Sequence, residues 1–413
     1  MSSKKFPTIS LYSGAGGLDY GLEAAGFETR VAIEMDKDAC KTLRANRPSW
    51  QVLEDRIEEV SSSVLLEAAG LKRGEAALLV GGPPCQPFSK SGYWSQGDTK
   101  RLDDPRAKTL DQYMRVVGDT LPQVMLLENV AGLSFSGKDE GIQLLFRNLE
   151  QINRKHGTKY TPNCKILRLV EYGIPQLRER FFMIADKDGR QFDFPLPTHR
   201  HPNQPVDNEA LFDSNLKNPT TAWDAIGHLD PPPSEESLHV YGKWADLLPS
   251  IPEGENYLWH TPRKGGVPLF GWRTRYWGFL LKLAKRKPSW TIQAQPGSSI
   301  GPFHWKNRRL STSEMLALMT FPDVTIVGGR TAIQRQLGNA VPSLMTEILG
   351  REILRQFFGL RRRKPYVLDL QAAQSTPRAE RLKRVEEKFL HLIGDHADHP
   401  GTGLGPMAMA RGR

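Results

Sequence analysis

Short apolar runs alternate with amphipathic stretches along the first half of the chain. The apolar runs predict strands at residues 8–12, 30–35, 77–80, 124–128, 165–170 and 181–185. Between them, apolar positions recur at helical spacing and predict helices at 18–25, 38–46, 106–120 and 140–155, with Gly26 and Gly157 as C-terminal caps. Because strands that alternate with helices stack into a mostly parallel sheet, we predict an α/β, doubly wound core.

The second half of the chain has a different texture. From about residue 187 it is rich in proline and tryptophan, and seven of the nine tryptophans fall between residues 223 and 305. Helical periodicity returns at 311–319 and 341–358, which indicates a return to the first domain. We predict a first domain over 1–186, a smaller irregular domain over 187–306, a return over 307–360 and a basic tail over 361–413. The tail is expected to hold one amphipathic helix, with Leu382, Val385 and Phe389 on one face.

Composition narrows the class of protein. The 413 residues are 25% charged and 39% hydrophobic, with a mean hydropathy of -0.46, which describes a soluble, enzyme-sized chain. No run approaches the ~20 apolar residues of a membrane helix and the start does not resemble a signal peptide, so a cytoplasmic chain is expected. The three scattered cysteines, Cys40, Cys85 and Cys164, suit neither a disulfide framework nor a zinc site. Any of them with a role would act alone, as a thiol.

The basic residues are clustered. Residues 256–313 hold eleven Lys and Arg without one Asp or Glu, and residues 351–413 carry a net +6. Because the whole chain carries +10, the remaining residues carry a net -7. An acidic body with two basic regions is typical of a protein that binds nucleic acid. A charge run is often only a solvated surface, but eleven cations without an acid favour binding.

A glycine cluster, Gly14, Gly16 and Gly17, stands between the first predicted strand and the first predicted helix. Twenty residues after Gly14 comes Glu34, where α/β nucleoside sites place a carboxylate for the ribose hydroxyls. A glycine-rich turn alone can be only a tight turn, but the ordered set favours a nucleoside cofactor. Asp19 occupies the position of the third glycine in G-x-G-x-x-G. S-adenosylmethionine, which has no pyrophosphate, therefore fits better than NAD.

A second candidate site follows the strand predicted at 77–80. The strand opens into Gly81-Gly82-Pro83-Pro84-Cys85, at the carboxyl edge of the predicted sheet. Most lone cysteines are small buried hydrophobes, and we expect this of Cys40 and Cys164. Cys85 is instead a candidate nucleophile, because prolines and glycines hold it in a loop. Glu128, at the end of the next strand, is either a helix N-cap or a functional carboxylate.

Five ordered blocks resemble those of DNA (cytosine-5)-methyltransferases. The resemblance covers roughly residues 8–186 and 290–350, and its strongest blocks are 12–27, 82–89, 128–130, 172–180 and 336–342. Tyr12 stands where the family usually has Phe. Arg56 occupies the place of an adenine-contacting Asp, with Asp55 one position earlier, and Met319-Thr320 replaces a common Gln-Gly.

The resemblance implies a Rossmann-like, S-adenosylmethionine-dependent methyltransferase in which residues 187–306 form a target-recognition domain. The implied reaction is methyl transfer to carbon 5 of a flipped-out cytosine within a specific short duplex DNA sequence, by addition of the Cys85 thiolate at carbon 6. Glu128 would protonate ring nitrogen 3, and Arg178 and Arg180 would hold the carbonyl oxygen and the glutamate. The alternative for these arginines is a surface ion-pair cluster with Glu179.

Further residues are expected to bind the cofactor or the DNA. The cofactor set is Tyr12, Gly14, Gly16, Gly17, Leu18, Glu34, Met35, Asp55, Ile57, Pro84, Leu110, Asn339 and Ala340. The DNA set is Gln86, Ser89, Arg263, Arg273, Arg275 and Arg309. The loop at 89–104 is either the element that closes over the flipped base or an inert surface loop. Most of the tryptophans are expected to hold the small domain together.

The resemblance also implies the setting in which the protein acts. We expect a bacterial, cytoplasmic monomer that acts on double-stranded DNA at the nucleoid, without a metal, as the modification half of a restriction-modification system. A functional pairing with a cognate restriction endonuclease fits this setting. The alternatives are an RNA cytosine-5 methyltransferase, a non-catalytic DNA-binding relative and a nicotinamide oxidoreductase. The long segment before the last blocks favours DNA, and the presence of Cys85, Glu128 and Arg180 favours an enzyme.

Overall fold

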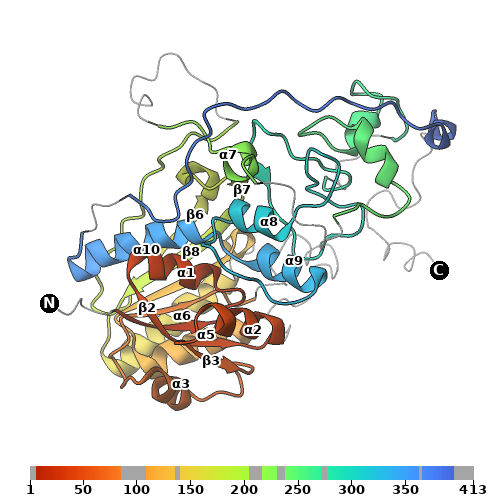
Figure 1. The fold of residues 1–413 in the computed structure, drawn as a ribbon. Helices are drawn as coiled ribbons and strands as arrows, with labels where there is room; N and C mark the ends of the chain where they lie inside the picture. The colour runs from red at the N-terminus through yellow and green to blue at the C-terminus, as the bar shows by residue number, and fades with distance from the viewer. Residues whose placement is uncertain are drawn as a thin grey trace. The chain divides into compact units, whose positions relative to one another are not determined.

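The computed structural model describes residues 6–84, 108–134, 140–203, 216–229, 238–271, 277–361 and 365–394 (Figure 1). The chain divides into two compact units. The first comprises Met1–Ile174, Arg178–Thr198 and Met319–Asp369. The second comprises Pro175–Leu177, His199–Leu318 and Leu370–Arg413, so the last part of the chain belongs to the second unit.

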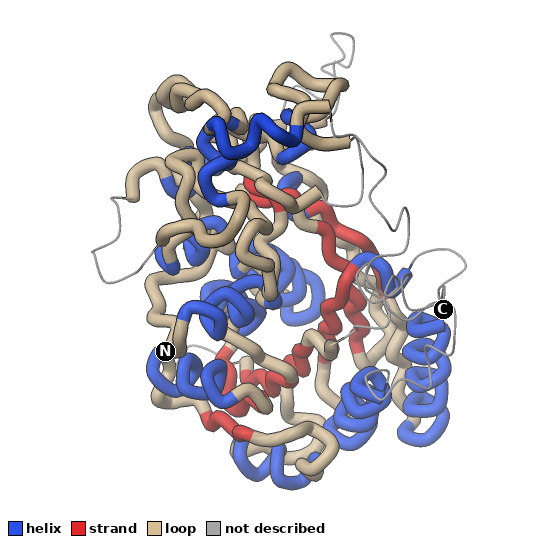
Figure 2. The backbone as a smooth tube through the Cα atoms, turned by 90° about the vertical axis from the view of Figure 1, so that its right-hand side faces the viewer, coloured by secondary structure: helices blue, strands red, loops and turns tan. Residues whose placement is uncertain are grey.

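A seven-stranded sheet forms the centre of the first unit (Figures 1 and 2). Its strand order is β3-β2-β1-β4-β5-β8-β6. The first five strands in this order run parallel, and β8 is antiparallel to both of its neighbours. The strands are β1 (Pro7–Leu11), β2 (Glu28–Glu34), β3 (Gln51–Glu54), β4 (Leu78–Gly81), β5 (Val124–Val130), β6 (Asn163–Arg168) and β8 (Glu179–Asp186). The predicted doubly wound, mostly parallel sheet is confirmed.

Helices cover both faces of this sheet. They are α1 (Gly17–Ala25), α2 (Lys37–Asn46), α3 (Ser62–Ala69), α5 (Lys108–Thr120), α6 (Glu140–His156), α9 (Arg330–Asn339) and α10 (Ser343–Phe358), with short 3-10 turns η3 (Ala131–Ser134) and η4 (Leu169–Tyr172). Gly26 caps α1 with a φ of 114°, and Gly157 follows α6 with a φ of 70°. Both glycines therefore end helices as predicted, because an αL residue favours glycine.

The alternation of side chains along the strands creates two apolar cores. On β5, Met125 and Leu127 join the core that includes α5 and α6, whereas Val124 and Leu126 join the core that includes α1 and α10. Both sets are fully buried. A strand that is buried on both faces has a continuous apolar sequence, which is why β4 and β5 were predictable from the chain alone.

The parallel strands bring their carboxyl ends to one edge of the sheet. After β1 the chain turns to β2 on one side, and β4 lies on the other side of β1. In open α/β sheets, this reversal of strand order leaves a crevice at the carboxyl ends, where ligands bind. The segments after β1, β2, β4 and β5 all start from this edge, so the glycine loop, Glu34, the Gly82–Pro84 segment and Glu128 belong to one region.

The second unit contains little regular structure. Its elements are β7 (Gln176–Leu177), which pairs with β9 (Ser289–Trp290), helices α7 (Ala222–Ile226) and α8 (Thr312–Leu318), and 3-10 turns η5 (Ala245–Ser250), η6 (Tyr257–His260) and η7 (Glu387–Leu392). Aromatic packing holds it together: Trp223 lies 5.7 Å from the buried Trp305, and Trp244 stacks on Phe389. Trp277 is an exception, since 46% of it is exposed.

The predicted tail helix is wrong. Residues 381–386 form no helix, and the 3-10 turn η7 contains only Phe389 of the three predicted face residues. Phe389 is buried and Val385 partly buried against the second unit's core, but Leu382 is 49% exposed. Phe389 and Val385 therefore pack against the core of the second unit, but they do not form one face of a helix.

Candidate active site

The loop after β1 has the backbone that a close ligand approach requires. Gly14 and Gly16 adopt φ values of 55° and 86°, in the left-handed region that favours glycine. The N–H of Gly16 donates to the carbonyl oxygen of Ser13 and closes the turn. A methyl group added at Gly14 would meet nothing within 4 Å, whereas one at Gly17 would lie 2.4 Å from the carbonyl oxygen of Val341. Gly14 therefore borders open space, and Gly17 is required by packing.

Glu34 connects this loop to β2. Its Oε2 accepts a 2.8 Å hydrogen bond from the Gly14 N–H, and its Oε1 accepts one of 2.8 Å from the Asp36 N–H. Burial raises the pKa of Glu34, and the two backbone donors oppose this rise. The carboxylate is thus held at the glycine loop, where it can also accept hydrogen bonds from a ribose. Met35, the next residue, is 61% exposed.

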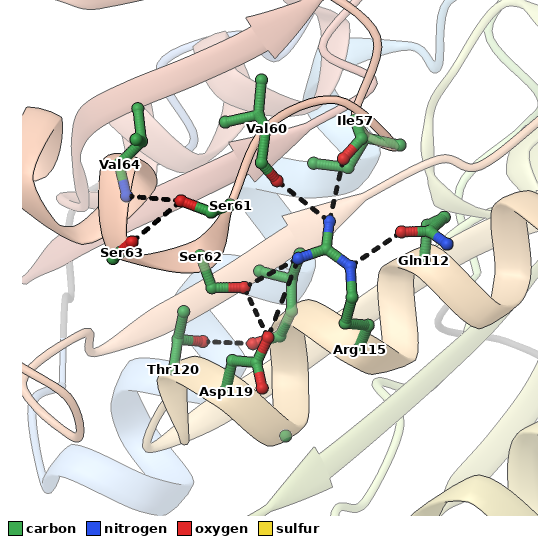
Figure 3. Close-up of polar contacts among 12 residues, drawn as sticks. Ile57, Val60, Ser61, Ser62, Ser63, Val64, Gln112, Arg115, Asp119 and Thr120 are labelled. Carbon is green, nitrogen blue, oxygen red and sulfur yellow. Dashed lines mark hydrogen bonds and ion pairs between the residues drawn. The ribbon is translucent and has the colours of Figure 1, made fainter.

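Arg115 on α5 fixes the segment after β3 (Figure 3). Its guanidinium donates to the carbonyl oxygens of Ile57 at 2.8 Å and Val60 at 3.1 Å. It also bonds Gln112 and Ser62, and Ser62 in turn bonds Asp119. The sequence gives no signal for Arg115, because the partners that it fixes, Ile57, Val60 and Ser62, lie more than fifty residues away in the chain.

The predicted residues of this segment differ in their surroundings. Ile57 is buried, with 3% of it exposed, and Leu110 on α5 is 1% exposed in the same core. Asp55 is exposed; its N–H donates to the Glu34 carbonyl oxygen, and its side chain accepts from the N–H of Arg56. Asp55 is therefore tied to the end of β2 through its backbone only.

The segment before Cys85 is held from two sides. The side-chain amide of Asn129 donates to the carbonyl oxygen of Pro83 at 3.1 Å, and the hydroxyl of Thr109 donates to that of Pro84 at 3.0 Å. The Tyr12 hydroxyl donates to the Thr109 carbonyl oxygen at 3.0 Å. These bonds connect the loop after β1, the start of α5 and the end of β5. Cys85, Gln86 and Ser89 lie outside the described residues, as does the loop at 89–104.

Glu128 and Arg180 form a buried ion pair. The Arg180 Nε lies 2.8 Å from the Glu128 Oε1, and the two side chains are 15% and 11% exposed. Burial raises the pKa of Glu128, while Arg180 and Arg178 partly offset the rise. A methyl group added at Gly82 would lie 2.9 Å from the Glu128 Oε2, so the segment after β4 passes directly beside this carboxyl. Glu128 lies within β5 and does not cap a helix.

Arg178 holds the C-terminal end of α9 and the residue that follows it. Its guanidinium donates to the carbonyl oxygens of Gly338 at 2.9 Å and Ala340 at 2.7 Å. The side chain is buried, with 1% of the residue exposed, so a surface ion-pair cluster with Glu179 does not describe it. Asn339 lies between the two bonded carbonyls and is exposed. Residues 338–340 are therefore fixed to the sheet across about 160 residues of sequence.

The cysteines outside the candidate site behave differently from each other. Cys40 is fully buried in α2, where its Sγ donates to the Glu34 carbonyl oxygen and burial raises its pKa to about 12. This confirms the expected burial of Cys40. Cys164 is exposed, so the expectation of a buried side chain is wrong there. Its strand, β6, forms the edge of the sheet and has three consecutive exposed residues.

Several cations of the basic segment are structural. Lys282 and Lys285 are 3% and 2% exposed, and Lys285 pairs with Glu253 and Glu380. Arg308 pairs with the buried Glu314 at 2.6 Å. The interpretation of all eleven cations as one DNA-binding set is therefore wrong for these three. Burial and ion pairing in the fold give these three cations a structural role, which their sequence positions do not reveal.

The predicted DNA-contacting arginines of the second unit fall into two groups. Arg263 is exposed after η6, and the guanidinium of Arg309 lies 5.8 Å from the ring centre of Tyr241, which is 52% exposed. Arg273 and Arg275 lie outside the described residues.

Within the described residues, no group of three His, Cys, Asp or Glu could hold a metal ion, and no helix has the length and apolarity needed to cross a membrane.

The strand order of the sheet, with Glu34 and the glycine loop at its carboxyl edge, defines the Rossmann-like methyltransferase class. A family model described as C-5 cytosine-specific DNA methylase matches residues 6–355, and the chain belongs to this family. It is a DNA (cytosine-5-)-methyltransferase.

The chain is similar to proteins from several bacteria. The type II methyltransferase M.SacI of Streptomyces achromogenes is 39% identical over 375 residues, which cover 85% of this chain and 93% of the relative. M1.HphI of Haemophilus parahaemolyticus is 30% identical over 355 residues, 84% of this chain and 86% of the relative. A prophage-encoded DNA modification methyltransferase structure from E. coli has the same fold, with a TM-score of 0.59 at 20% identity, over 86% of this chain and 100% of that one.

Proposed function

We propose that this enzyme transfers a methyl group from S-adenosylmethionine to carbon 5 of a flipped-out cytosine within a specific short duplex DNA sequence, as the modification half of a restriction-modification system. The observation that carries the proposal is the buried Glu128–Arg180 pair beside Gly82, three residues before Cys85. The raised pKa of Glu128 suits donation of a proton to a cytosine that the loop containing Cys85 presents. The Arg180 guanidinium holds the Glu128 carboxyl in a fixed position.

The residues divide the chemistry among them. Cytosine carbon 5 is a weak nucleophile, and addition of the Cys85 thiolate at carbon 6 makes it electron-rich. The addition places charge on ring nitrogen 3, which neutral Glu128 protonates. Arg180 holds the Glu128 carboxyl in place for this transfer. After methylation, a base takes the carbon 5 proton and the Cys85 thiolate leaves. Ring nitrogen 3 returns its proton to Glu128, which restores the aromatic cytosine.

The cofactor site is the glycine loop with its surroundings. S-adenosylmethionine, when bound, supplies the methyl group. The open space at Gly14 leaves room for a ligand, and the Glu34 carboxylate at this loop suits the ribose hydroxyls. Tyr12 is partly buried against the core that holds Ile57 and Leu110, and its ring suits an adenine face. Arg178 fixes residues 338–340, which include the predicted cofactor contacts Asn339 and Ala340.

The second unit is proposed to recognise the DNA sequence. Its exposed cations, including Arg263, suit phosphate contacts, and Arg309 with Tyr241 suits a contact to a base or phosphate. A stacked cytosine cannot reach Glu128, so the base must leave the duplex, and the loop at 89–104 is the candidate to close over it.

Bisulfite sequencing of DNA from cells that express the protein tests the proposal. Methylated cytosines are expected within one short sequence, and none are expected with the Cys85→Ala variant. Because thiolate addition precedes methyl transfer, Cys85→Ala should abolish activity while it leaves duplex binding in a gel-shift assay largely intact. Retained methylation by this variant would rule out Cys85 as the nucleophile. Methylated cytosine in RNA alone would favour the RNA methyltransferase instead.

A further inference from the structure

The end of the chain forms a segment that we term the C-terminal strap, residues 370–394. It follows the part of the chain that matches the family model, which ends at residue 355. The strap belongs to the second unit and contains only one short helical turn, η7. In Figure 1 it is the dark-blue trace at the end of the described chain. The family resemblance assigns it no role.

A buried cation fastens the middle of the strap. The Lys285 Nζ lies 2.7 Å from the Glu253 Oε1 and 2.9 Å from the Glu380 Oε1, and it donates to the carbonyl oxygen of Arg378 at 3.1 Å. The N–H of Glu380 also donates to Glu253 at 2.9 Å. Lys285 is 2% exposed, so the strap covers it. The side chains of Lys285 and Glu253 are 3% and 9% exposed, whereas that of Glu380 is 47% exposed. The charged hydrogen bonds of the buried Lys285 therefore hold a defined geometry at the strap.

Further contacts fasten the strap on both sides of this point. The N–H of Ala373 donates to Asp224 at 2.8 Å, and that of Lys383 donates to the Pro249 carbonyl oxygen at 3.1 Å. Phe389 stacks on Trp244 with 5.8 Å between the ring centroids and an interplanar angle of 15°, and 3% of Phe389 is exposed. The strap is therefore an ordered part of the second unit.

The outward side of the strap is basic. Arg378, Arg381, Lys383 and Arg384 are all exposed, and among the described residues none of the four side chains forms an ion pair. The acid within this stretch, Glu380, is paired with Lys285. Lys285 is shared between Glu380 and Glu253, and the buried Lys282 also attracts both carboxylates, so two buried cations balance these two acids. The four exposed cations therefore remain available to an external anion.

One more cation lies beside this stretch. Arg286 is exposed and donates to the carbonyl oxygen of Thr376. It follows Lys285 directly in the chain, so the anchor that holds the strap also brings Arg286 to it. On the far side, Glu386 and Asp246 are both engaged by Lys388.

We propose that the C-terminal strap is a second DNA-binding surface, which contacts phosphates of the duplex outside the recognition sequence through Arg378, Arg381, Lys383 and Arg384. This inference rests on the proposed function, in which duplex DNA is the substrate. Cations held on an anchored backbone lose little conformational freedom on binding, and each phosphate contact releases a counterion. Such contacts raise affinity without reading bases.

Two duplexes with the same target sequence test the proposal, one ending close to the target and one with long flanks. The variant replaces all four strap cations by Gln (R378Q, R381Q, K383Q and R384Q). The matched control replaces four exposed cations that precede β4 and β6, at the amino edge of the sheet (K72Q, R154Q, K155Q and K159Q). Dissociation constants are measured at several salt concentrations, and methylation is measured at saturating short duplex.

The wild type and the control are expected to bind the long duplex more tightly than the short one. The strap variant should lose most of this gain, roughly tenfold or more in low salt, with a salt slope lower by about 3 to 4. Its methylation rate on saturating short duplex should be unchanged, as should its urea midpoint, because the anchoring contacts remain.

Wild-type affinity and slope in the strap variant would overturn the inference while the proposed function stands. An equal loss in the control would also overturn it, since general charge would then be the cause. If the wild-type protein itself fails to bind or methylate duplex DNA, the proposed function falls, and the strap inference falls with it.

Discussion

At the scale of single residues, Thr109 connects three parts of the candidate active site: the loop after β1, the segment before Cys85 and the start of α5. Its hydroxyl holds the Pro84 carbonyl oxygen, and its own carbonyl oxygen accepts the Tyr12 hydroxyl. Pro84 directly precedes Cys85 in the chain. We therefore propose that Thr109 is a positioning residue, which acts through the backbone on Cys85, the proposed nucleophile.

We expect Thr109→Val to lower the methylation rate because it removes the bond to Pro84 and keeps the shape. The loss of one such bond corresponds to about 0.5–1.5 kcal/mol, or roughly 2- to 10-fold in kcat. The change in methylation rate is measured by single-turnover kinetics and by the rate of covalent trapping on a duplex with 5-fluorocytosine. Thr109→Ser, which keeps the hydroxyl, is the control and should retain most of the rate. Equal rates for Val and wild type would contradict this role.

Asp19 is a second residue whose surroundings decide its chemistry. It is fully buried in α1, and burial raises its pKa from an ordinary 3.8 to about 7. Below about pH 4 the carboxyl is neutral in both folded and unfolded chains. As the pH rises to 7, the unfolded chain loses the proton first, so stability falls across this window and stays lower above it.

We expect Asp19→Asn to stabilise the protein at pH 8 by up to roughly 4 kcal/mol, because the amide cannot ionise. The gain should shrink as the pH falls and vanish near pH 4. Urea unfolding at pH 4, 6 and 8 measures it. A difference between variant and wild type that does not change with pH would show that ionisation of Asp19 is not its cause.

At the scale of elements, α1 and α10 pack unusually closely. A methyl group added at Gly21 would lie 2.0 Å from the Thr346 Oγ1 and 2.1 Å from the Ser343 carbonyl oxygen. Both neighbours belong to α10, and a backbone atom cannot move aside alone. The glycine is therefore required by the helix contact.

We expect Gly21→Ala to force the two helices apart and to cost about 1–3 kcal/mol or more in the free energy of unfolding. Gly329→Ala is the control: a methyl group there meets nothing within 4 Å, and the φ of -73° suits any residue. Urea unfolding of both variants distinguishes the effects. A Gly21→Ala midpoint equal to that of the control would contradict the close packing.

The sequence predicted most elements of the first unit but missed three. β3 has four residues that are half-buried or exposed, so it lacks the apolar run that marks the central strands. α3 has only eight residues, and α9 has three apolar residues in ten, so neither shows a clear helical period. Tertiary contacts stabilise such elements, as when the Thr42 hydroxyl of α2 bonds Gln336 of α9.

At the scale of the whole molecule, the net charge of +10 combines cations of two kinds. Lys282, Lys285 and Arg308 serve the interior of the second unit, whereas the strap cations face solvent. Arg273 and Arg275 belong to the same acid-free segment and lie outside the described residues. A charge count from the sequence cannot separate these kinds, because burial and pairing depend on the fold.

We expect the double variant Arg273→Ala and Arg275→Ala to weaken DNA binding and to lower the salt slope by about 2, since two phosphate contacts release about two counterions. Affinity titrations at several salt concentrations measure this. Arg154→Ala with Lys155→Ala, both exposed on α6, is the control and should leave the slope unchanged. A slope equal to that of the wild type would show that the two arginines do not contact the DNA.

The sequence alone determined the α/β class, the glycine loop, Glu34 and the candidate pair of Cys85 and Glu128, because these depend on local periodicity and on residues that follow strand ends. The tertiary structure decided the partners. Arg178 bonds residues 338–340, Thr109 bonds Pro84, and Lys285 anchors the strap. Each of these contacts joins residues that are distant in the chain, and only the packing of the elements brings them within hydrogen-bonding distance.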